Sequence, residues 1–172
     1  STNGYKSYEE YMDVVEQDRD GKEAKGLVNM LTTNHTFFMR EFEHFEYFHK
    51  VVLPQLKEKE KGKKDLHIWC AAASSGEEPY TIAMVLMDYF GMEHNQWDTT
   101  VLATDISTKV LEKALKGVYN NEQLVNLPAN WRKRYFQPVN QEQSIVTDHL
   151  KKQVLFRQFN LMEPFPFKKK MH

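Results

Sequence analysis

The residues with the clearest chemical potential lie mid-chain, where small side chains lead into two carboxylates. Residues 71–76 read Ala-Ala-Ala-Ser-Ser-Gly, and Glu77, Glu78 and Pro79 follow directly. A dinucleotide site would have several glycines here, so that pyrophosphate can approach the backbone N–H groups. This loop has one glycine, and Pro79 lacks an N–H donor. Glu77 and Glu78 occupy the place that a phosphate would need. Repulsion between two like charges about 4 Å apart costs on the order of 4 kcal/mol at an effective dielectric constant of about 20. The loop therefore disfavours NAD, FAD and ATP.

A cationic nucleoside suits the same loop better. Glu77 or Glu78 can oppose a positive charge or accept a hydrogen bond, and Asp105 can accept both hydroxyl protons of a ribose. S-adenosylmethionine has a ribose, an ammonium and a sulfonium but no phosphate, so it is the ligand that these residues favour. Each carboxylate also has a local interpretation. Glu77 and Glu78 can compensate the dipole of a first helical turn, and Asp105 can be a loop or capping residue.

Strands and helices must bring these side chains together. Helical patterns follow the first two apolar runs, with Ser107, Gly91 and Gly117 as expected caps. Alternating strands and helices are typical of an α/β fold with a parallel sheet, whose ligands bind at the carboxyl ends of the strands. We therefore expect the loop at 71–78, Asp105 and Asn160 to surround one crevice. The expected strands are residues 66–72, 99–103 and 154–156.

The remaining segments complete a division into two parts. Two short helices are expected within residues 5–31, and an aromatic stripe from Phe38 to Val52 predicts a helix that ends near Pro54. The charged residues 57–64 are interpreted as a solvated connector. A small β insert is expected at residues 137–153. The predicted parts are residues 1–53, the remainder of a helical domain with its linker helix, and residues 54–172, a ligand-binding domain.

Composition excludes several classes of protein. The 172 residues are 41% hydrophobic and 27% charged, which can fill a core and excludes disordered and collagen-like chains. A net charge of −1 gives no global field that attracts nucleic acid, and no apolar run approaches the roughly 20 residues of a membrane span. The single cysteine, Cys70, suits a reducing compartment. No histidine has the spacing of a metal ligand, so no metal site is expected.

Several segments resemble the CheR-type chemoreceptor glutamate methyltransferases. They are Thr-Thr-Asn-His-Thr-Phe-Phe-Met-Arg-Glu (32–41), Ala-Ala-Ala-Ser-Ser-Gly-Glu-Glu-Pro-Tyr (71–80) and Ala-Thr-Asp-Ile (103–106). Shorter matches continue in order at residues 110–114, 117–119, 134–136 and 160–161. The segment at 71–80 is the most specific. The resemblance implies a Rossmann-like S-adenosylmethionine-dependent methyltransferase fold preceded by a small helical N-terminal segment, in a chain truncated at both ends.

The resemblance also implies roles for individual residues. Arg40 would lie closest to the chemistry; its alternative is a surface ion pair with Glu41, Glu43 or Glu46. Which of Glu77 and Glu78 holds the amino acid part of the cofactor stays open, with Glu78 favoured. The implied cofactor contacts are Asn34, Thr36, Arg40, Glu78 or Glu77, Asp105 for the ribose, and Asn160 and Leu161 for the adenine.

The implied reaction transfers a methyl group from S-adenosylmethionine to glutamate carboxylates of methyl-accepting chemotaxis receptors. The products are a methyl ester and S-adenosylhomocysteine. We expect a cytoplasmic monomer that acts on the cytoplasmic domain of the receptor, without nucleic acid and without membrane insertion. Two alternatives stay open: a non-catalytic module of the same fold that senses the cofactor or binds receptors, and a methyltransferase for another acceptor. In some family members, a small β subdomain at the position of residues 137–153 binds a receptor tail.

Overall fold

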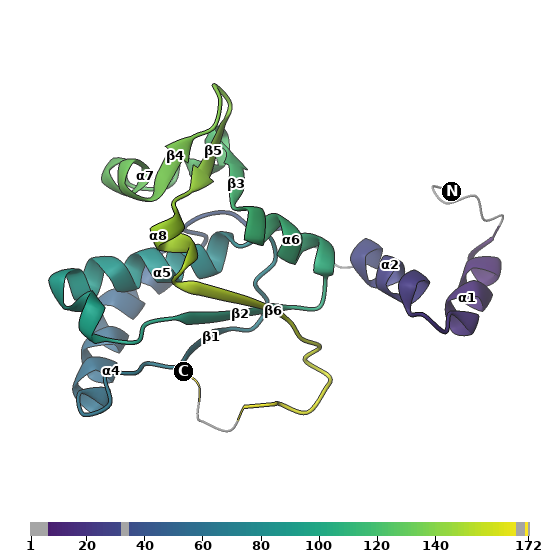
Figure 1. Cartoon of the computed structure of the whole chain (residues 1–172), viewed down its shortest axis with the longest axis horizontal. Helices are drawn as coiled ribbons and strands as arrows, with labels where there is room; N and C mark the ends of the chain where they lie inside the picture. The colour runs from purple at the N-terminus through teal and green to yellow at the C-terminus, as the bar shows by residue number, and fades with distance from the viewer. Residues whose placement is uncertain (1–6, 32–34, 168–170, 172) are drawn as a thin grey trace.

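The computed structural model describes residues 7–31, 35–167 and 171, and a parallel three-stranded sheet lies at its centre (Figure 1). The strand order is β1-β2-β6, and all pairs are parallel. The three predicted strands are confirmed, although β1 is shorter than its apolar run. The strands are β1 (Ile68–Cys70), β2 (Val101–Asp105) and β6 (Val154–Gln158).

Helices α5 and α6 connect these strands and contact β2 and β6 of the sheet. Most side chains of α5 are buried, because it supplies much of the core. Ser107 caps α6 by accepting the Val110 N–H, and Gly117 ends α6 in the left-handed region at φ 65°, as its sequence predicts. Gly91 ends α5, also as predicted. The elements are α5 (Glu77–Phe90), the 3-10 helix η2 (Gly91–Gln96) and α6 (Thr108–Lys116).

The first two helices, α1 (Tyr8–Gln17) and α2 (Lys22–Leu31), extend from one side of the body (Figure 1). Two helices were expected here, and both are present. They join the body through α2, where Asn29 Oδ1 accepts a hydrogen bond of 2.5 Å from Ser107 Oγ.

The prediction that the aromatic helix ends near Pro54 is wrong. The chain makes a turn at residues 38–41 and then runs through α3 (Phe42–Tyr47), the π-helix η1 (Phe48–Val52) and α4 (Leu53–Glu60). A proline inside a helix removes one N–H donor, and the π-helical turn just before Pro54 changes the hydrogen-bond pattern so that the helix continues. Part of the predicted connector at 57–64 is therefore helical, and the helix crosses the predicted division at residue 53 without a break. That division stays a prediction.

A second, antiparallel sheet, called the small sheet below, lies above the first in Figure 1. Its strand order is β3-β5-β4. Nearly all of the β4–β5 hairpin falls within residues 137–153, where an insert was expected. The small sheet also contains β3, which lies before this stretch, and α8 lies near the end of the stretch. The elements of this part are β3 (Val118–Asn120), the 3-10 helix η3 (Asn121–Leu124), α7 (Ala129–Tyr135), β4 (Phe136–Pro138), β5 (Gln143–Val146) and α8 (Asp148–Lys151).

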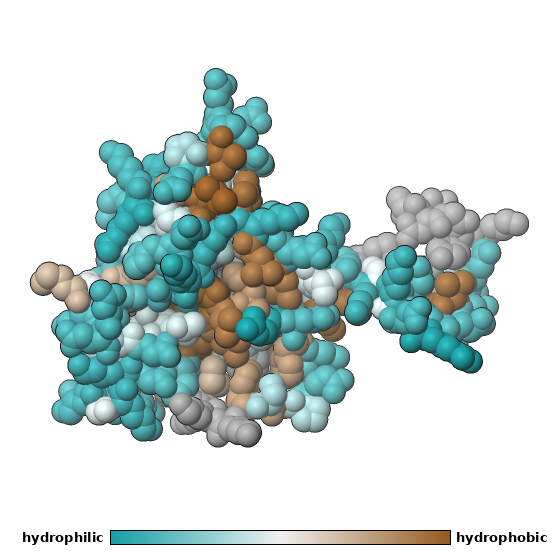
Figure 2. All heavy atoms as spheres, viewed as in Figure 1, coloured by the Kyte–Doolittle hydropathy of each residue, from teal (hydrophilic) through white to brown (hydrophobic). Residues whose placement is uncertain are grey.

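Hydrophobic side chains gather over the middle of the main body in Figure 2, with hydrophilic ones around them. One continuous core joins the parallel sheet, α5 and the small sheet. Among the described residues, no helix has the length and apolar character needed to cross a bilayer.

Candidate functional site

The carboxyl ends of the three parallel strands bring the predicted site segments to one edge. Strand β1 ends at Cys70 and leads into the loop at 71–76, and β2 ends at Asp105. The N–H of Phe159, just beyond β6, donates to the carbonyl oxygen of Asp105 at 3.0 Å. The sheet therefore places Asp105 beside the segment that contains Asn160, at the edge where ligands of parallel sheets bind.

Asp105 is held by two backbone donors. Its Oδ2 accepts the Ser74 N–H at 2.8 Å, and its Oδ1 accepts the Ser107 N–H at 2.9 Å. A carboxylate has about four acceptor sites, so these bonds fix the side chain and leave capacity for two hydroxyl protons. Asp105 therefore anchors the loop at 71–76 and can also accept hydrogen bonds from a ribose.

Glu77 and Glu78 point to different environments, because successive residues of a helix lie about 100° apart. Glu77 is 1% exposed; its carboxylate accepts from Ser75 Oγ at 2.7 Å and from Gln123 Nε2 at 3.4 Å. Burial raises the pKa of Glu77 above its ordinary value, against the opposing effect of the Ser75 hydrogen bond. Glu78 is exposed. Of the two, only Glu78 faces a space that a ligand can enter.

Cys70, the last residue of β1, interacts with both proposed carboxylates of the site, Glu78 and Asp105. Its buried thiol donates to Glu78 Oε1 at an Sγ–Oε1 distance of 3.7 Å. Burial raises the pKa of this thiol well above its usual range, and the charges of Glu78 and Asp105 raise it further. The thiol is therefore protonated at neutral pH and is a poor nucleophile. Its contribution is to orient Glu78.

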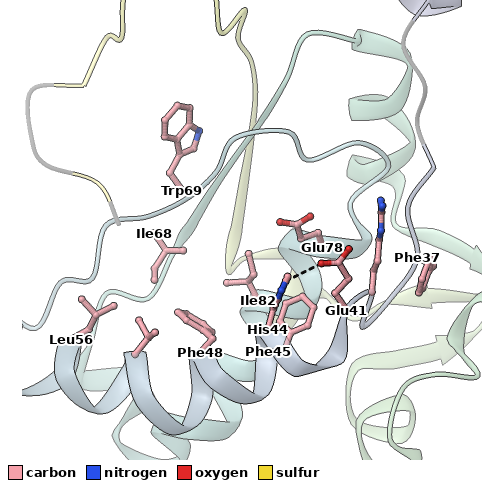
Figure 3. A pocket seen from close by; sticks show the side chains of 12 residues that line it. Phe37, Glu41, His44, Phe45, Phe48, Leu56, Ile68, Trp69, Glu78 and Ile82 are labelled. Atoms are coloured by element: carbon pink, nitrogen blue, oxygen red, sulfur yellow. Dashed lines mark ion pairs between the residues drawn. The ribbon is translucent and has the colours of Figure 1, made fainter.

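A cavity of about 500 Å³ opens beside Glu78, between β1, α5 and the run from α3 to α4. Figure 3 shows Phe45, Phe48 and Leu56 along that helical run, with Ile68 and Ile82 opposite them. The wall is apolar at depth and charged at one end, a combination that suits a nucleoside with an amino acid tail. The lining residues are Phe37, Arg40, Glu41, His44, Phe45, Phe48, Val52, Leu56, Ile68, Trp69, Glu78 and Ile82.

Arg40 lies in a backbone turn of unusual conformation. Its neighbours Met39 and Glu41 have φ angles of 59° and 55°, in the left-handed region that non-glycine residues seldom adopt. The Arg40 guanidinium is exposed, and its Nη1 donates to the His35 carbonyl oxygen at 2.8 Å. The turn is anchored on α5, where Thr81 Oγ1 accepts the Met39 N–H at 3.4 Å. Strained turns of this kind cluster at functional sites.

The other predicted site residues differ in how they lie relative to the cavity and the Arg40 turn. Thr36 is half-buried just before this turn, whereas Asn34 lies outside the described residues. Asn160 Oδ1 accepts the Met162 N–H at 3.0 Å, and Leu161 is 49% exposed. Neither Asn160 nor Leu161 is among the residues that line the cavity.

Two aromatic contributors were not anticipated as site residues. Trp69 lines the cavity and donates from Nε1 to Thr104 Oγ1 at 3.0 Å. Its indole also packs against the segment after β6, with Phe167 at a ring-centroid distance of 4.8 Å. Tyr119 donates to the Ser75 carbonyl oxygen at 2.7 Å. A tryptophan inside an apolar run gives no local signal of a site, and Tyr119 is 44 positions from Ser75.

The described part of the chain contains no group of three His, Cys, Asp or Glu side chains arranged to hold a metal ion. The ionisable groups proposed for the site are the carboxylates of Glu78 and Asp105 and the guanidinium of Arg40, and Glu41 and His44 also line the cavity. Such a set suits a cationic, hydroxyl-bearing organic ligand.

The fold and this donor set define a nucleoside-binding α/β domain. Residues 34–172 match the family described as "CheR methyltransferase, SAM binding domain", and the chain belongs to this family. The predicted methyltransferase fold, its S-adenosylmethionine class of ligand and the resemblance are thereby confirmed.

Curated relatives of the chain are named as chemotaxis protein methyltransferases. The chain is 41% identical over 172 residues to the "Chemotaxis protein methyltransferase" of Borreliella burgdorferi, with 97% of this chain and 60% of the relative covered. It is 35% identical to the protein of that name in Escherichia coli, covering 94% and 57%. It is 40% identical to "Chemotaxis protein methyltransferase 2" of Pseudomonas aeruginosa, covering 91% and 54%. The chain thus spans about 60% or less of the length of these relatives.

Proposed function

We propose that this chain binds S-adenosylmethionine at the carboxyl edge of its parallel sheet and serves methyl transfer to glutamate carboxylates of chemoreceptors. The observation that carries the proposal is the cavity of about 500 Å³ that Glu78 and Arg40 line together. Asp105, which is not among the lining residues, keeps acceptor capacity beside the loop at 71–76 that leads to Glu78. The names of the relatives support chemotaxis as the setting.

Binding is assigned to the acidic groups. Asp105 accepts the ribose hydroxyl protons, and Glu78 pairs with the ammonium group of the amino acid part. Arg40 and Thr36 contact the methionine end, and Asn160 with Leu161 frames the adenine. When bound, S-adenosylmethionine supplies an electrophilic methyl group on a cationic sulfur. Glu78 is exposed in the first turn of α5, where its charge disfavours a phosphate-bearing ligand.

Catalysis makes modest demands on the protein. A glutamate acceptor is already ionised at neutral pH, with an ordinary pKa of about 4.3, so no general base is required. An anion and a cation neutralise each other as they react, so the main task is alignment, which can supply up to about 7–11 kcal/mol. The exposed Arg40 guanidinium can hold the acceptor carboxylate with two N–H groups.

The finer parts of the proposal concern the partner and the setting. The acceptor is the cytoplasmic domain of methyl-accepting receptors, the protein acts in the cytoplasm, and it acts as a monomer without nucleic acid.

Two assays test the proposal. Calorimetric titration with S-adenosylhomocysteine is expected to show one site, and its absence contradicts the proposal. Tritiated S-adenosylmethionine is expected to label receptor-containing membranes with groups that alkali releases as methanol, the signature of a methyl ester. Binding without labelling supports a non-catalytic module, and alkali-stable label supports another acceptor.

Arg40, in the turn at residues 38–41, is tested against Lys50, a cation on the helical run that follows this turn. Arg40→Ala is expected to lower kcat more than it raises the Kd for S-adenosylhomocysteine. Lys50→Ala removes a charge that pairs with Glu46 at 2.9 Å on the exposed side of η1, and is expected to leave both values unchanged. If Arg40→Ala weakens binding with kcat preserved, its catalytic assignment is wrong.

A further inference from the structure

Tyr119 connects the small sheet to the loop at 71–76. It belongs to β3 and is 1% exposed, and its hydroxyl donates to the Ser75 carbonyl oxygen at 2.7 Å. Burial raises the pKa of this phenol well above its ordinary value, and Glu77 and Tyr80 add to the rise. The hydroxyl is therefore protonated at every physiological pH, and the donor to the loop is permanent.

The ring of Tyr119 contacts the other side of the site. It packs edge-on against Phe38, with a centroid distance of 4.9 Å and an interplanar angle of 79°. Phe38 is fully buried and begins the turn that presents Arg40. Phe136 of β4 holds the same Phe38 ring at 5.5 Å. Two strands of the small sheet therefore support the Arg40 turn, while one of them also supports the loop.

Gly76 provides the space for this hydroxyl. A Cβ atom at Gly76 would lie 2.8 Å from the Tyr119 hydroxyl and 2.9 Å from the Ala114 Cβ. The backbone of the loop can approach β3 only because this residue has no side chain.

A second connection runs through Glu77. Ser75 Oγ donates to this buried carboxylate at 2.7 Å, and Gln123 Nε2 donates to its other oxygen at 3.4 Å. Gln123 lies in η3, directly after β3, and its Oε1 accepts the Asn120 N–H at 3.0 Å. The carbonyl of Ser75 is thus held by Tyr119 of β3, and its side chain by Glu77 of α5, which Gln123 of η3 contacts.

We propose that Tyr119 is a positioning residue for the cofactor site: through its hydroxyl and its ring, the small sheet sets the shape of both the loop at 71–76 and the Arg40 turn. Tyr119 itself does not touch the ligand. The inference rests on the proposed function, in which this site binds S-adenosylmethionine. It makes the small sheet part of the binding machinery rather than an appendage.

The test compares buried tyrosine hydroxyls by calorimetric titration with S-adenosylhomocysteine. Tyr119→Phe keeps the ring and removes one hydrogen bond, so it is expected to raise Kd about three- to tenfold. In turnover with S-adenosylmethionine, KM is expected to rise with kcat nearly unchanged at saturation. A merely stabilising hydroxyl does not produce this split.

Two matched variants control for stability. Tyr80→Phe removes a buried hydrogen bond of 3.0 Å to the carbonyl oxygen of Ala114 on α6, and no hydrogen bond to the loop at 71–76. Tyr135→Phe removes a buried hydroxyl that has no hydrogen-bond partner in the described structure. Both are expected to keep the wild-type Kd, even though Tyr80→Phe lowers the thermal midpoint as Tyr119→Phe does. Gln123→Ala tests the second connection, and is expected to raise Kd at least about twofold.

The possible results distinguish failure of the proposed function from failure of the Tyr119 inference. Wild-type protein that binds no S-adenosylhomocysteine overturns the proposed function, and this inference with it. Wild-type binding together with an unchanged Kd in Tyr119→Phe overturns the inference alone, whatever the effect of Gln123→Ala. Equal weakening by Tyr119→Phe and Tyr80→Phe also overturns it, because general stability then explains the effect.

Discussion

The carboxylate of Asp105 and the backbone N–H of Ser74 form a 2.8 Å hydrogen bond across 31 positions of the chain. Ser74 has a φ angle of 47°, a left-handed conformation that costs a residue with a side chain roughly 1–2 kcal/mol. The Asp105 carboxylate therefore holds the loop after β1 in a shape that the backbone alone disfavours. One side chain thus combines a structural task with the proposed ribose contact.

Substitutions at Asp105 are expected to affect stability and binding together. Asp105→Ala removes the acceptor of two backbone N–H groups, which predicts a loss of about 1–3 kcal/mol in the free energy of unfolding. It also removes the proposed ribose acceptor, so S-adenosylhomocysteine is expected to bind more than about tenfold more weakly. Urea denaturation and calorimetry measure the two effects.

Asp98→Asn is the control for Asp105→Asn. The Asp98 carboxylate accepts the Thr100 N–H at 3.0 Å in an exposed position remote from the cavity, so its amide variant is expected to bind like wild type. Asp105→Asn keeps one carbonyl acceptor, but its NH₂ group faces a backbone N–H that the carboxylate had accepted. Its affinity for S-adenosylhomocysteine is expected to lie between those of wild type and Asp105→Ala. Wild-type affinity in Asp105→Asn contradicts the ribose assignment.

Substitutions of the two adjacent glutamates are expected to affect binding to different degrees. Glu78→Gln removes the charge that faces the proposed ammonium group, so affinity for S-adenosylhomocysteine is expected to fall about tenfold or more with an unchanged thermal midpoint. Glu77→Gln replaces a buried carboxylate by a neutral group of similar size. Its main effect is expected on the pH dependence of stability. If Glu77→Gln weakens binding more than Glu78→Gln does, the assignment is reversed.

The sign of the Glu77 effect follows from burial. Burial raises the pKa of Glu77 above its ordinary 4.5, so the native state holds this proton at pH values where the unfolded state has lost it. Stability contributed by Glu77 is therefore greatest below about pH 4.5 and is lost as the pH rises through the raised value. Glu77→Gln is expected to gain stability relative to wild type as urea titrations move from pH 4 to pH 8. A constant difference between the two proteins contradicts this expectation.

Local patterns predicted the parts of the site that depend on local chemistry. Ser107 and Gly117 mark the ends of α6 because capping is decided within a few residues, and Asp105 ends a strand that its apolar run predicts. The orientation of Glu77 could not be read locally, since both glutamates lie in one helical turn and the burial of Glu77 depends partly on Gln123, 46 positions away. The prediction of a helix end at Pro54 was wrong because the π-helix η1 before this proline lets the helix continue, which the local sequence does not indicate.

His94 is expected to make the protein less stable in mild acid. Burial lowers the pKa of His94 below its ordinary 6.5, and the nearby charges of His149 on α8 and Arg134 on α7 lower it further. Its Nε2 shares a 2.8 Å hydrogen bond with Thr99 Oγ1. The unfolded state binds a proton first as the pH falls below 6.5, so stability is lost from there downward and is fully present above it.

The measurement is the free energy of unfolding in urea between pH 5 and pH 8. His94→Gln cannot titrate, and its stability is expected to fall less between pH 7 and pH 5 than that of wild type. Identical slopes for wild type and His94→Gln contradict the role of His94.

Gly76 is expected to be the least tolerant glycine of the described chain. Gly76→Ala places a side chain at a φ angle of 98° and brings its Cβ to 2.8 Å from the Tyr119 hydroxyl, which predicts a loss of about 2–4 kcal/mol in the free energy of unfolding. Gly21 has a φ angle of 66°, and a Cβ atom there would meet no heavy atom within 4 Å. Gly21→Ala therefore isolates the backbone strain at about 1 kcal/mol.

The energetic coupling between Gly76 and Tyr119 tests directly whether the added methyl group meets the hydroxyl. Because the Gly76→Ala methyl group and the Tyr119 hydroxyl compete for the same space, Tyr119→Phe is expected to cost less in the Gly76→Ala background than in wild type. The contact with the Ala114 Cβ at 2.9 Å remains in both backgrounds, so recovery is partial. A double-mutant cycle in urea measures the coupling. Strict additivity would show that the loop moves away from β3 when it carries the methyl group, and that Gly76 does not depend on the hydroxyl that it faces.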